Sequence, residues 1–323
     1  MGDEEQTVPP VLQDAITHEI DEWWSHKQQL LDAANAPSTP LYHYTDATGL
    51  LGIVKNQEIW FTSIFHLNDS DELSYGLGMV LDILHQISDE SNSKIVTSFC
   101  DLFERFVTHK YGNLFGFYVA SFSRAKDDLG QWRAYTANGK GFALGLAPTL
   151  FHVVDKPNRK PHEAVFFSPV VYGKEIVVSR LRELIDRAIS IVTRPKNVAA
   201  YDGNNRLAFE FFSEVAIHIS SPLLWHAITS KHEAYQNEDE MRLIILGGRE
   251  NLRPYVEVRV RGGEFVPFIR SEMLVQEKGA ITELVIGPSA AETTEDGLRV
   301  MLELYGIEHE SLITHSSIPY RSF

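Results

Sequence analysis

The sequence predicts an α+β fold built on a mixed or split β-sheet core with flanking helices. Strand-like apolar segments and amphipathic helical segments are interspersed, and the strand-like segments concentrate in the second half of the chain. No regular strand–helix–strand alternation appears, although a doubly wound parallel sheet would require one. With 323 residues, 44% of them hydrophobic, the chain can bury enough apolar surface to form a real core.

The first third of the chain is predicted to be mostly helical. Apolar side chains recur at helical spacing from Leu12 to Leu31, and Pro37 ends this helix. Thr45 or Asp46 can cap the helix that follows the first strand. The predicted elements are a helix over residues 11–34, a strand over 41–44, a helix carrying Leu50, Leu51 and Val54, a strand over 59–62, and helices over 72–87 and 94–109.

The remaining two thirds are predicted to supply most of the sheet. Asp127 or Asp128 caps a short helix through Tyr135, and Asn138-Gly139 turns the chain into the next strand. Strands are predicted over residues 115–122, 141–146, 165–172, 241–246, 255–260, 265–269 and 281–286, and helices over 174–192, 204–219 and 291–305. We expect residues 1–38 to form an N-terminal helical segment. Residues 39–323 should form a single α+β domain, with a helical insertion around residues 174–220.

The composition excludes several classes of protein. The net charge of −15 makes non-specific binding to nucleic acid or to an anionic membrane unfavourable. The single cysteine, Cys100, excludes an intramolecular disulfide and a thiolate zinc site, and it is expected to be a core thiol. The first ten residues lack the features of a signal peptide, and no apolar run approaches the roughly 18 residues of a membrane helix. We therefore expect a cytoplasmic protein without a membrane partner.

A first polar motif, Tyr42-His43-Tyr44-Thr45, ends a strand and opens a helix. Side chains alternate along a strand, so His43 faces opposite to the two tyrosines. A histidine beside the free amides of a helix start could hydrogen-bond a polar ligand. The alternative is a partly buried histidine next to tyrosines that pack in the core.

A second motif consists of a strand end followed by a short helix. Ser121 and Ser123 point to the same side of the predicted strand, Arg124 follows, and hydroxyls before a helix start can hold phosphate. Trp132 and Tyr135 are three residues apart and share a face of the helix. These rings either wall a ligand pocket or pack into the core.

A third motif lies where the polar segment before residue 241 becomes a strand. At a spacing of two, Glu238, Glu240 and Arg242 share one face. A carboxylate that enters the core beside a cation is costly unless the two are paired. The arrangement predicts either a Glu240–Arg242 ion pair at the sheet edge or a catalytic carboxylate oriented by its neighbour.

An acidic cluster follows the second predicted strand, with Asn68, Asp69, Asp71 and Glu72 within five positions. Their oxygens suit Mg²⁺ or Ca²⁺, but the glycine and the closing glutamate of a calcium loop are absent. A turn with a helix cap is the alternative. The thirteen histidines show no ligand spacing.

These motifs, in their order along the chain, resemble a widespread bacterial family known only as domain-of-unknown-function family 2971. The matching stretches are residues 41–45, 59–72, 121–141, 171–175, 231–244 and 281–288. The segment from Ser121 to Gly141 is the most specific of them. The resemblance covers most of the chain after the first helix and implies no activity.

A second resemblance does imply an activity. The Tyr-His-Tyr-Thr strand, the helix with Leu50 and Ile53, and the strand after it are similar to the opening of ADP-ribosyltransferase-like toxins. In that superfamily a histidine or arginine on the first core strand contacts the ribose on the nicotinamide side, and a residue on a second strand shapes the pocket. A late glutamate, often in a Glu-x-Glu pair, completes the site. His43, Ser121 or Ser123, and Glu240 stand at the corresponding positions.

The resemblance implies an enzyme that uses NAD as a substrate, either an ADP-ribosyltransferase or an NAD hydrolase, in a bacterial toxin or phage-defence effector. Glu240 would be catalytic and His43 would orient the ribose, with no metal. The other residues assigned to the nucleotide site are Tyr44, Ser121, Ser123, Arg124, Trp132, Tyr135, Glu238 and Arg242. Arg124 or Lys140 could contact phosphate. The acceptor is unknown and could be protein, nucleic acid or water.

Two other functions fit the sequence. A non-catalytic binding or regulatory module could use Trp23-Trp24 to dock a protein partner or a second copy. A metal-dependent phosphoester hydrolase or nuclease could use Asp69, Asp71, Glu72 and Glu240, provided that the four carboxylates converge.

Overall fold

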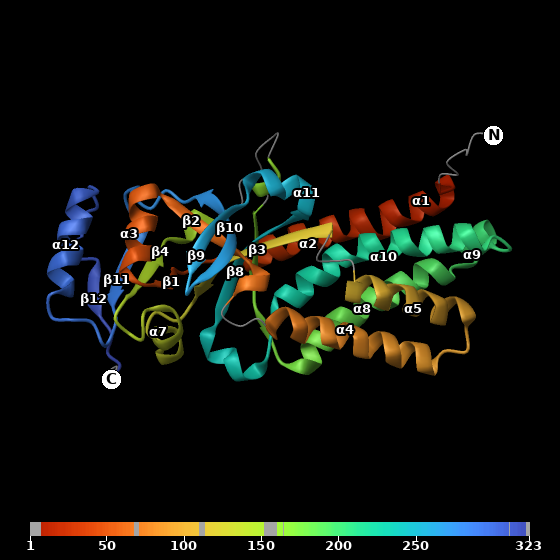
Figure 1. Cartoon of the computed structure of the whole chain (residues 1–323), viewed down its shortest axis with the longest axis horizontal. Helices are drawn as coiled ribbons and strands as arrows, with labels where there is room; N and C mark the ends of the chain where they lie inside the picture. The colour runs from red at the N-terminus through yellow and green to blue at the C-terminus, as the bar shows by residue number, and fades with distance from the viewer. Residues whose placement is uncertain are drawn as a thin grey trace. The chain divides into compact units, whose positions relative to one another are not determined.

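The computed structural model confirms an α+β fold with a mixed sheet (Figure 1). It describes residues 8–67, 71–109, 114–151, 160–163, 165–309 and 311–320. The chain divides into two compact units. Unit 1 comprises residues 1–31, 69–115 and 171–233, and unit 2 comprises residues 32–68, 116–170 and 234–323. The N-terminal helical residues up to Leu31 and the predicted insertion thus fall in one unit.

Unit 2 contains a ten-stranded sheet in which one main path runs β12-β11-β4-β1-β3-β2-β10-β9. Off this path, β8 pairs with both β3 and β5. The strands are β1 (Leu41–Thr45), β2 (Glu58–Ser63), β3 (Phe115–Ser123), β4 (Phe142–Leu146), β5 (Val165–Pro169), β8 (Glu240–Gly248), β9 (Glu257–Arg261), β10 (Glu264–Glu272), β11 (Ile281–Ile286) and β12 (Ile313–His315). The sheet is mixed because β11 and β12 are parallel, whereas the other registered pairs in it are antiparallel.

One face of this sheet carries the main apolar core of unit 2. Alternate strand residues such as Leu41, Phe61, Phe122 and Met241 point into it. The helices α3 (Ala47–Asn56) and α12 (Thr294–Leu304) supply further core side chains. The core therefore fixes which strand residues face the opposite side.

Two helix starts in unit 2 follow directly from the sequence. The Asp46 side chain accepts from the Gly49 N–H at 2.7 Å, which caps α3. The Asp128 side chain accepts from the Gln131 N–H at 2.9 Å, which caps α7 (Leu129–Tyr135). Each cap satisfies a backbone donor that the first helical turn leaves free.

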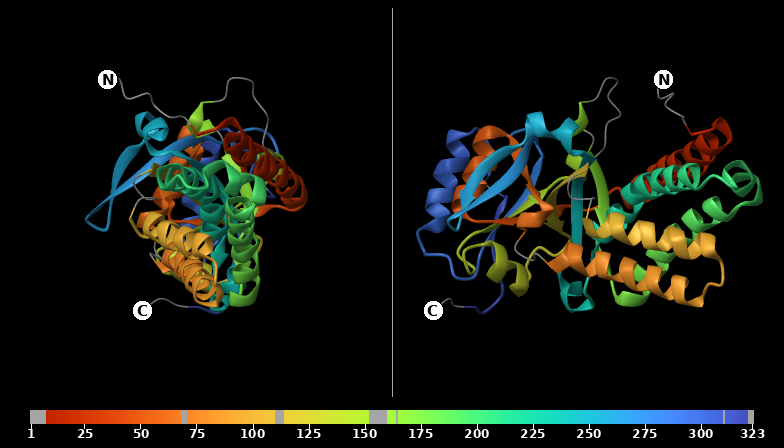
Figure 2. Two further views of the ribbon diagram at one scale, coloured as in Figure 1. Left: turned by 90° about the vertical axis from the view of Figure 1, so that its right-hand side faces the viewer. Right: turned by 45° about the vertical axis from the view of Figure 1, so that its right-hand side comes forward.

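Unit 1 is a bundle of helices that lie side by side in both views of Figure 2. Its elements are α1 (Pro10–Ile16), a π-helical turn (Thr17–Glu22), α2 (Trp23–Asn35, whose residues after Leu31 fall in unit 2), α4 (Asp71–Glu90), α5 (Lys94–His109), α8 (Lys174–Thr193), α9 (Pro195–Tyr201) and α10 (Asn205–Ile228), with the short parallel strands β6 (Val171–Tyr172) and β7 (Ser230–Lys231). Cys100 is buried among these helices as predicted.

Three of the predicted elements differ markedly in the structure, and α9, β7 and β12 were not predicted. The predicted strand over residues 165–172 is two strands, β5 and β6, which belong to different sheets. The predicted strand over 255–260 begins later, at Glu257, because residues 253–255 form a 3₁₀ turn. The predicted helix over 204–219 continues to Ile228 through Pro222, because packing on α4, α5 and α8 favours the longer helix over the usual break at proline.

Helix α10 also bears on the membrane prediction. In the described part of the chain it is the one helix long and apolar enough to cross a bilayer by length and composition. Half of its apolar window is buried inside the protein, and a buried core helix passes the same test.

Candidate active site

The three strands predicted to carry the site are neighbours in the sheet. β1 carries His43, β3 carries Ser121 and Ser123, and β8 carries Glu240. β3 pairs with both β1 and β8. Residues far apart in the sequence are therefore held on adjacent strands.

His43 is held by the middle strand. Its Nδ1 lies 2.9 Å from the Ser121 carbonyl oxygen, and its ring centroid lies 5.5 Å from that of Phe122. A carbonyl oxygen only accepts, so Nδ1 carries the proton and Nε2 of the neutral ring is an acceptor. Burial lowers the pKa of His43, the hydrogen bond to Ser121 opposes that change, and the charge of Arg259 adds to it. A neutral His43 therefore presents Nε2 as an acceptor.

Ser123 and Arg124 join β3 to the segment before β8. The Ser123 hydroxyl donates to the Glu238 carbonyl oxygen at 2.6 Å, and the Arg124 N–H donates to the Asp239 carbonyl oxygen at 3.1 Å. The Arg124 guanidinium also pairs with the Asp239 carboxylate at 3.0 Å. These contacts fix the start of β8, and they engage the arginine that was predicted to contact phosphate.

Glu240 and Arg242 form a buried, two-pronged ion pair. Arg242 Nε donates to Glu240 Oε1 at 2.7 Å, and Nη2 donates to Oε2 at 3.0 Å. The side chains are 6% and 1% exposed. The predicted pairing is present, but not at a sheet edge, because β8 lies between β3 and β5. The two-pronged hydrogen bonding fixes the orientation of the carboxylate.

The structure does not bring His43 into contact with Glu240. Within the described chain, His43 contacts Ser121 and Phe122, whereas Glu240 pairs with Arg242. Glu240 also alternates with Met241, which points into the main core. His43, two residues from Leu41 on β1, lies on the main-core side of the sheet, whereas Glu240 lies on the other side, so the two side chains are linked only through β3.

The predicted aromatic wall is a packed cluster. Tyr44, Trp132 and Tyr135 pack with Tyr42 and Val285 on the face of the sheet opposite the main core. The Tyr44 and Trp132 rings meet edge to face at 4.9 Å, and Trp132 is fully buried. A ligand could reach the Trp132 ring only if its neighbours moved, so the geometry favours the packing role.

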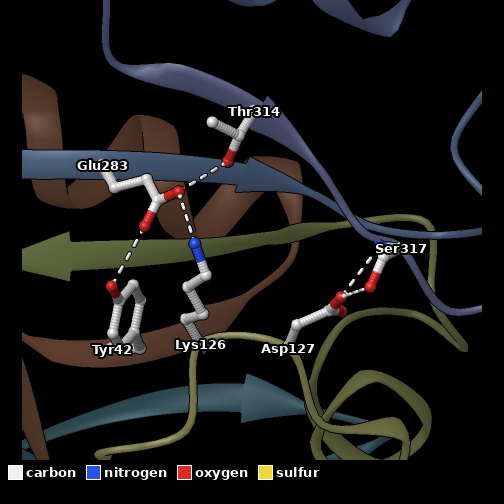
Figure 3. Close-up of polar contacts among 6 residues, drawn as sticks. All are labelled: Tyr42, Lys126, Asp127, Glu283, Thr314 and Ser317. Carbon is white, nitrogen blue, oxygen red and sulfur yellow. Dashed lines mark hydrogen bonds and ion pairs between the residues drawn. The ribbon is translucent and has the colours of Figure 1, made fainter.

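A polar cluster beside these rings anchors the loop after β3 (Figure 3). The Glu283 carboxylate accepts from the Tyr42 hydroxyl at 3.0 Å, from Lys126 Nζ at 3.2 Å and from the Thr314 hydroxyl at 2.9 Å. These hydrogen bonds outweigh the effect of burial and lower the pKa of Glu283. The loop is thus tied to β1, β11 and β12.

Asp127 is the second anchor of the same loop (Figure 3). Its carboxylate accepts from the Trp132 indole at 2.7 Å, from the Ser316 hydroxyl at 2.5 Å, and from the backbone N–H and hydroxyl of Ser317 at 2.8 and 2.9 Å. Burial opposes ionisation, but the hydrogen bonds prevail and the pKa of Asp127 is lowered. Asp127 thereby fixes α7 against the C-terminal strand region.

Sequence reasoning missed Asp127 as an anchor, and it also missed Glu283 and Arg259. The sequence predicts either Asp127 or Asp128 as the helix cap, and Asp128 takes this role. Glu283 interrupts an apolar strand, and Arg259 alternates with valines in a short strand. A charged residue within an otherwise apolar strand pattern was the signal that could have indicated these positions. It does not identify the partner, which lies far away in the sequence.

The predicted metal site falls largely outside the described residues. Asn68 and Asp69 lie outside them, and the side chains of Asp71 and Glu72 are not described. Within the described chain, no group of three or more histidine, cysteine, aspartate or glutamate side chains could hold a metal ion. A metal-dependent hydrolase or nuclease activity therefore stays a prediction.

The tryptophan pair offered for partner docking packs within unit 1. Trp24 is buried and meets the His226 ring at 5.5 Å. The Trp23 ring is covered by the Arg187 guanidinium at 4.0 Å and by Lys27 Nζ at 5.0 Å. Unit 1 also has an open groove of about 1140 Å³ between α5, α9 and α10, and none of the predicted site residues lines it.

Comparison with known proteins gives one family. The model of a family described as a protein of unknown function, DUF2971, matches residues 131–243, about a third of the chain. The match includes Trp132, Glu240 and Arg242, and it supports the resemblance seen in the sequence. No curated protein and no solved structure matches the chain. The likeness to ADP-ribosyltransferases stays a prediction.

Proposed function

We propose that the chain is an enzyme that cleaves the bond between nicotinamide and ribose in NAD, as an ADP-ribosyltransferase or an NAD hydrolase. The observation that carries this proposal is the pairing of β3 with both β1 and β8. It supports a site in which the strands that carry His43 and Glu240 flank the strand of Ser121 and Ser123. A toxin or phage-defence role would be consistent with such an activity.

The proposed chemistry assigns one role to each flanking residue. As the glycosidic bond breaks, its electron pair leaves with the nicotinamide nitrogen and positive charge develops on the ribose. The Glu240 carboxylate, oriented by Arg242, would stabilise that charge or hold a ribose hydroxyl. Nε2 of neutral His43 would accept a hydrogen bond from a ribose hydroxyl. Water or another acceptor then forms the new bond to the ribose and loses a proton.

The test is nicotinamide release from NAD by the purified chain, with and without a cell extract that supplies acceptors. Glu240→Gln should abolish release. Because Glu240 belongs to a buried ion pair, the folding of the Glu240→Gln variant must be checked by circular dichroism and thermal unfolding. Glu210→Gln is the matched control, since it removes a carboxylate paired with Arg206 at 2.8 Å on α10.

His43→Asn is a second variant that avoids the ion pair. The asparagine amide can still donate to the Ser121 carbonyl oxygen, but it lacks the Nε2 acceptor. We expect it to fold normally and to lose at least tenfold in release rate. Wild-type protein that releases no nicotinamide under either condition, or a folded Glu240→Gln variant with full activity, would overturn the proposal.

A further inference from the structure

Arg259 occupies an unusual place on β9. Its guanidinium carbon lies 5.2 Å from the Trp60 ring centroid and 5.7 Å from that of Phe268. Its Nη2 donates to the Thr62 hydroxyl at 2.9 Å. These contacts place a half-buried cation against β2 and β10 on the side of the sheet away from the main core.

The charge of Arg259 has no carboxylate partner in the described part of the chain, and its Nε is buried without a hydrogen-bond acceptor. Nearby Arg270 contrasts with it, because Arg270 pairs with both Glu257 and Glu58. A partly desolvated, unpaired charge is costly, and an anion would relieve the cost. Burial also lowers the pKa of Arg259, and neighbouring Arg261 adds to this effect.

Arg259 also lies near the candidate active site. Its hydrogen-bond partner, Thr62, is opposite Val119 of β3. Ser121, the partner of His43, is two residues further along the same strand. The charge of Arg259 contributes to the low pKa of His43, so the two groups are within electrostatic range. Arg259 and His43 thus adjoin one stretch of β3, with Arg259 on the side away from the main core and His43 against Phe122, which points into it.

We propose that Arg259, with Thr62, binds a phosphate group of a nucleoside diphosphate ligand. The guanidinium fork would donate N–H hydrogen bonds to phosphate oxygens in the two-pronged geometry that arginine favours. The Thr62 hydroxyl accepts from Arg259, so its own proton is free to be donated to the same phosphate. The identity of the nucleotide rests on the proposed function, whereas the anion follows from Arg259 itself.

Isothermal titration calorimetry with ADP measures binding at this site without any turnover. Parallel titrations with adenosine and with inorganic pyrophosphate distinguish the contribution of the nucleoside to binding from that of the phosphates. Arg259→Gln should weaken ADP binding by about 10- to 100-fold, because a hydrogen bond to a charged group is lost. Arg261→Gln is the matched control, since it removes an equal charge two residues away on the same strand, from an arginine that donates to the His66 carbonyl oxygen. Arg259→Lys should restore part of the affinity but not the fork geometry.

The two proposals fail in different ways. Binding of ADP and pyrophosphate that falls in Arg259→Gln but not in Arg261→Gln supports the subsite, even if no nicotinamide is released. Absence of ADP and pyrophosphate binding to the wild-type chain, or equal binding by wild type and Arg259→Gln, overturns it. Nicotinamide release that persists in Arg259→Gln alongside unchanged ADP binding would overturn the subsite and leave the enzymatic proposal standing.

Discussion

Replacement of Asp127 by alanine tests how the loop after β3 is held. The variant removes the acceptor of four hydrogen bonds, which come from Trp132, Ser316 and Ser317. The serine groups are partly exposed and can turn to water, at a cost of about 0.5 kcal/mol each. The Trp132 indole N–H is fully buried and would be left without an acceptor, which costs about 1–3 kcal/mol.

We therefore expect Asp127→Ala to lower the free energy of unfolding by about 2–4 kcal/mol, and Asp127→Asn to lower it by about half as much, because the amide keeps one acceptor oxygen. Urea denaturation measures the loss. Hydrogen exchange at the Trp132 indole N–H shows whether the loss of stability arises at this hydrogen bond, because the indole proton should exchange faster in Asp127→Ala.

Lys126→Ala is the control for this experiment. Lys126 is the neighbouring residue, and its exposed ion pair with Glu283 should contribute less than about 1 kcal/mol. An Asp127→Ala protein within about 0.5 kcal/mol of wild type, with unchanged indole exchange, would refute the claim that Asp127 anchors the loop.

Two further predictions concern the helices of unit 1. His226 is 2% exposed, and burial holds its pKa well below the ordinary value. The unfolded chain therefore takes up a proton near pH 6.5 that the folded chain does not, so stability falls as the pH drops. Between pH 7.5 and 5.5 wild type should lose about 1.4 kcal/mol more than His226→Leu in denaturant titrations, and parallel losses would contradict this. A Cβ on Gly76 would lie 2.7 Å from the Ala227 Cα, so Gly76→Ala should lower the unfolding free energy by about 1–3 kcal/mol. A thermal unfolding temperature equal to that of wild type would contradict the close packing of α4 on α10.

Several features of this chain were determined locally by the sequence. Asp46 and Asp128 cap their helices because each side chain needs only a backbone N–H three residues ahead. Glu240 and Arg242 share a strand face because side chains alternate, and their pairing follows from that spacing. The α+β class likewise follows from the type and order of segments.

Other features were decided only by the tertiary structure. β3 acquires β1 and β8 as neighbours through contacts between distant parts of the chain. Asp127 meets Ser317, and Arg259 meets Thr62, across separations of 190 and 197 residues. No local sequence pattern predicts such pairs, because the strand order and the position of the loops depend on how the whole sheet assembles on its apolar core. The same assembly leaves Arg259 without a carboxylate partner among the described residues. For that reason only the tertiary structure, and not the sequence, identifies Arg259 as the strongest candidate for a phosphate contact.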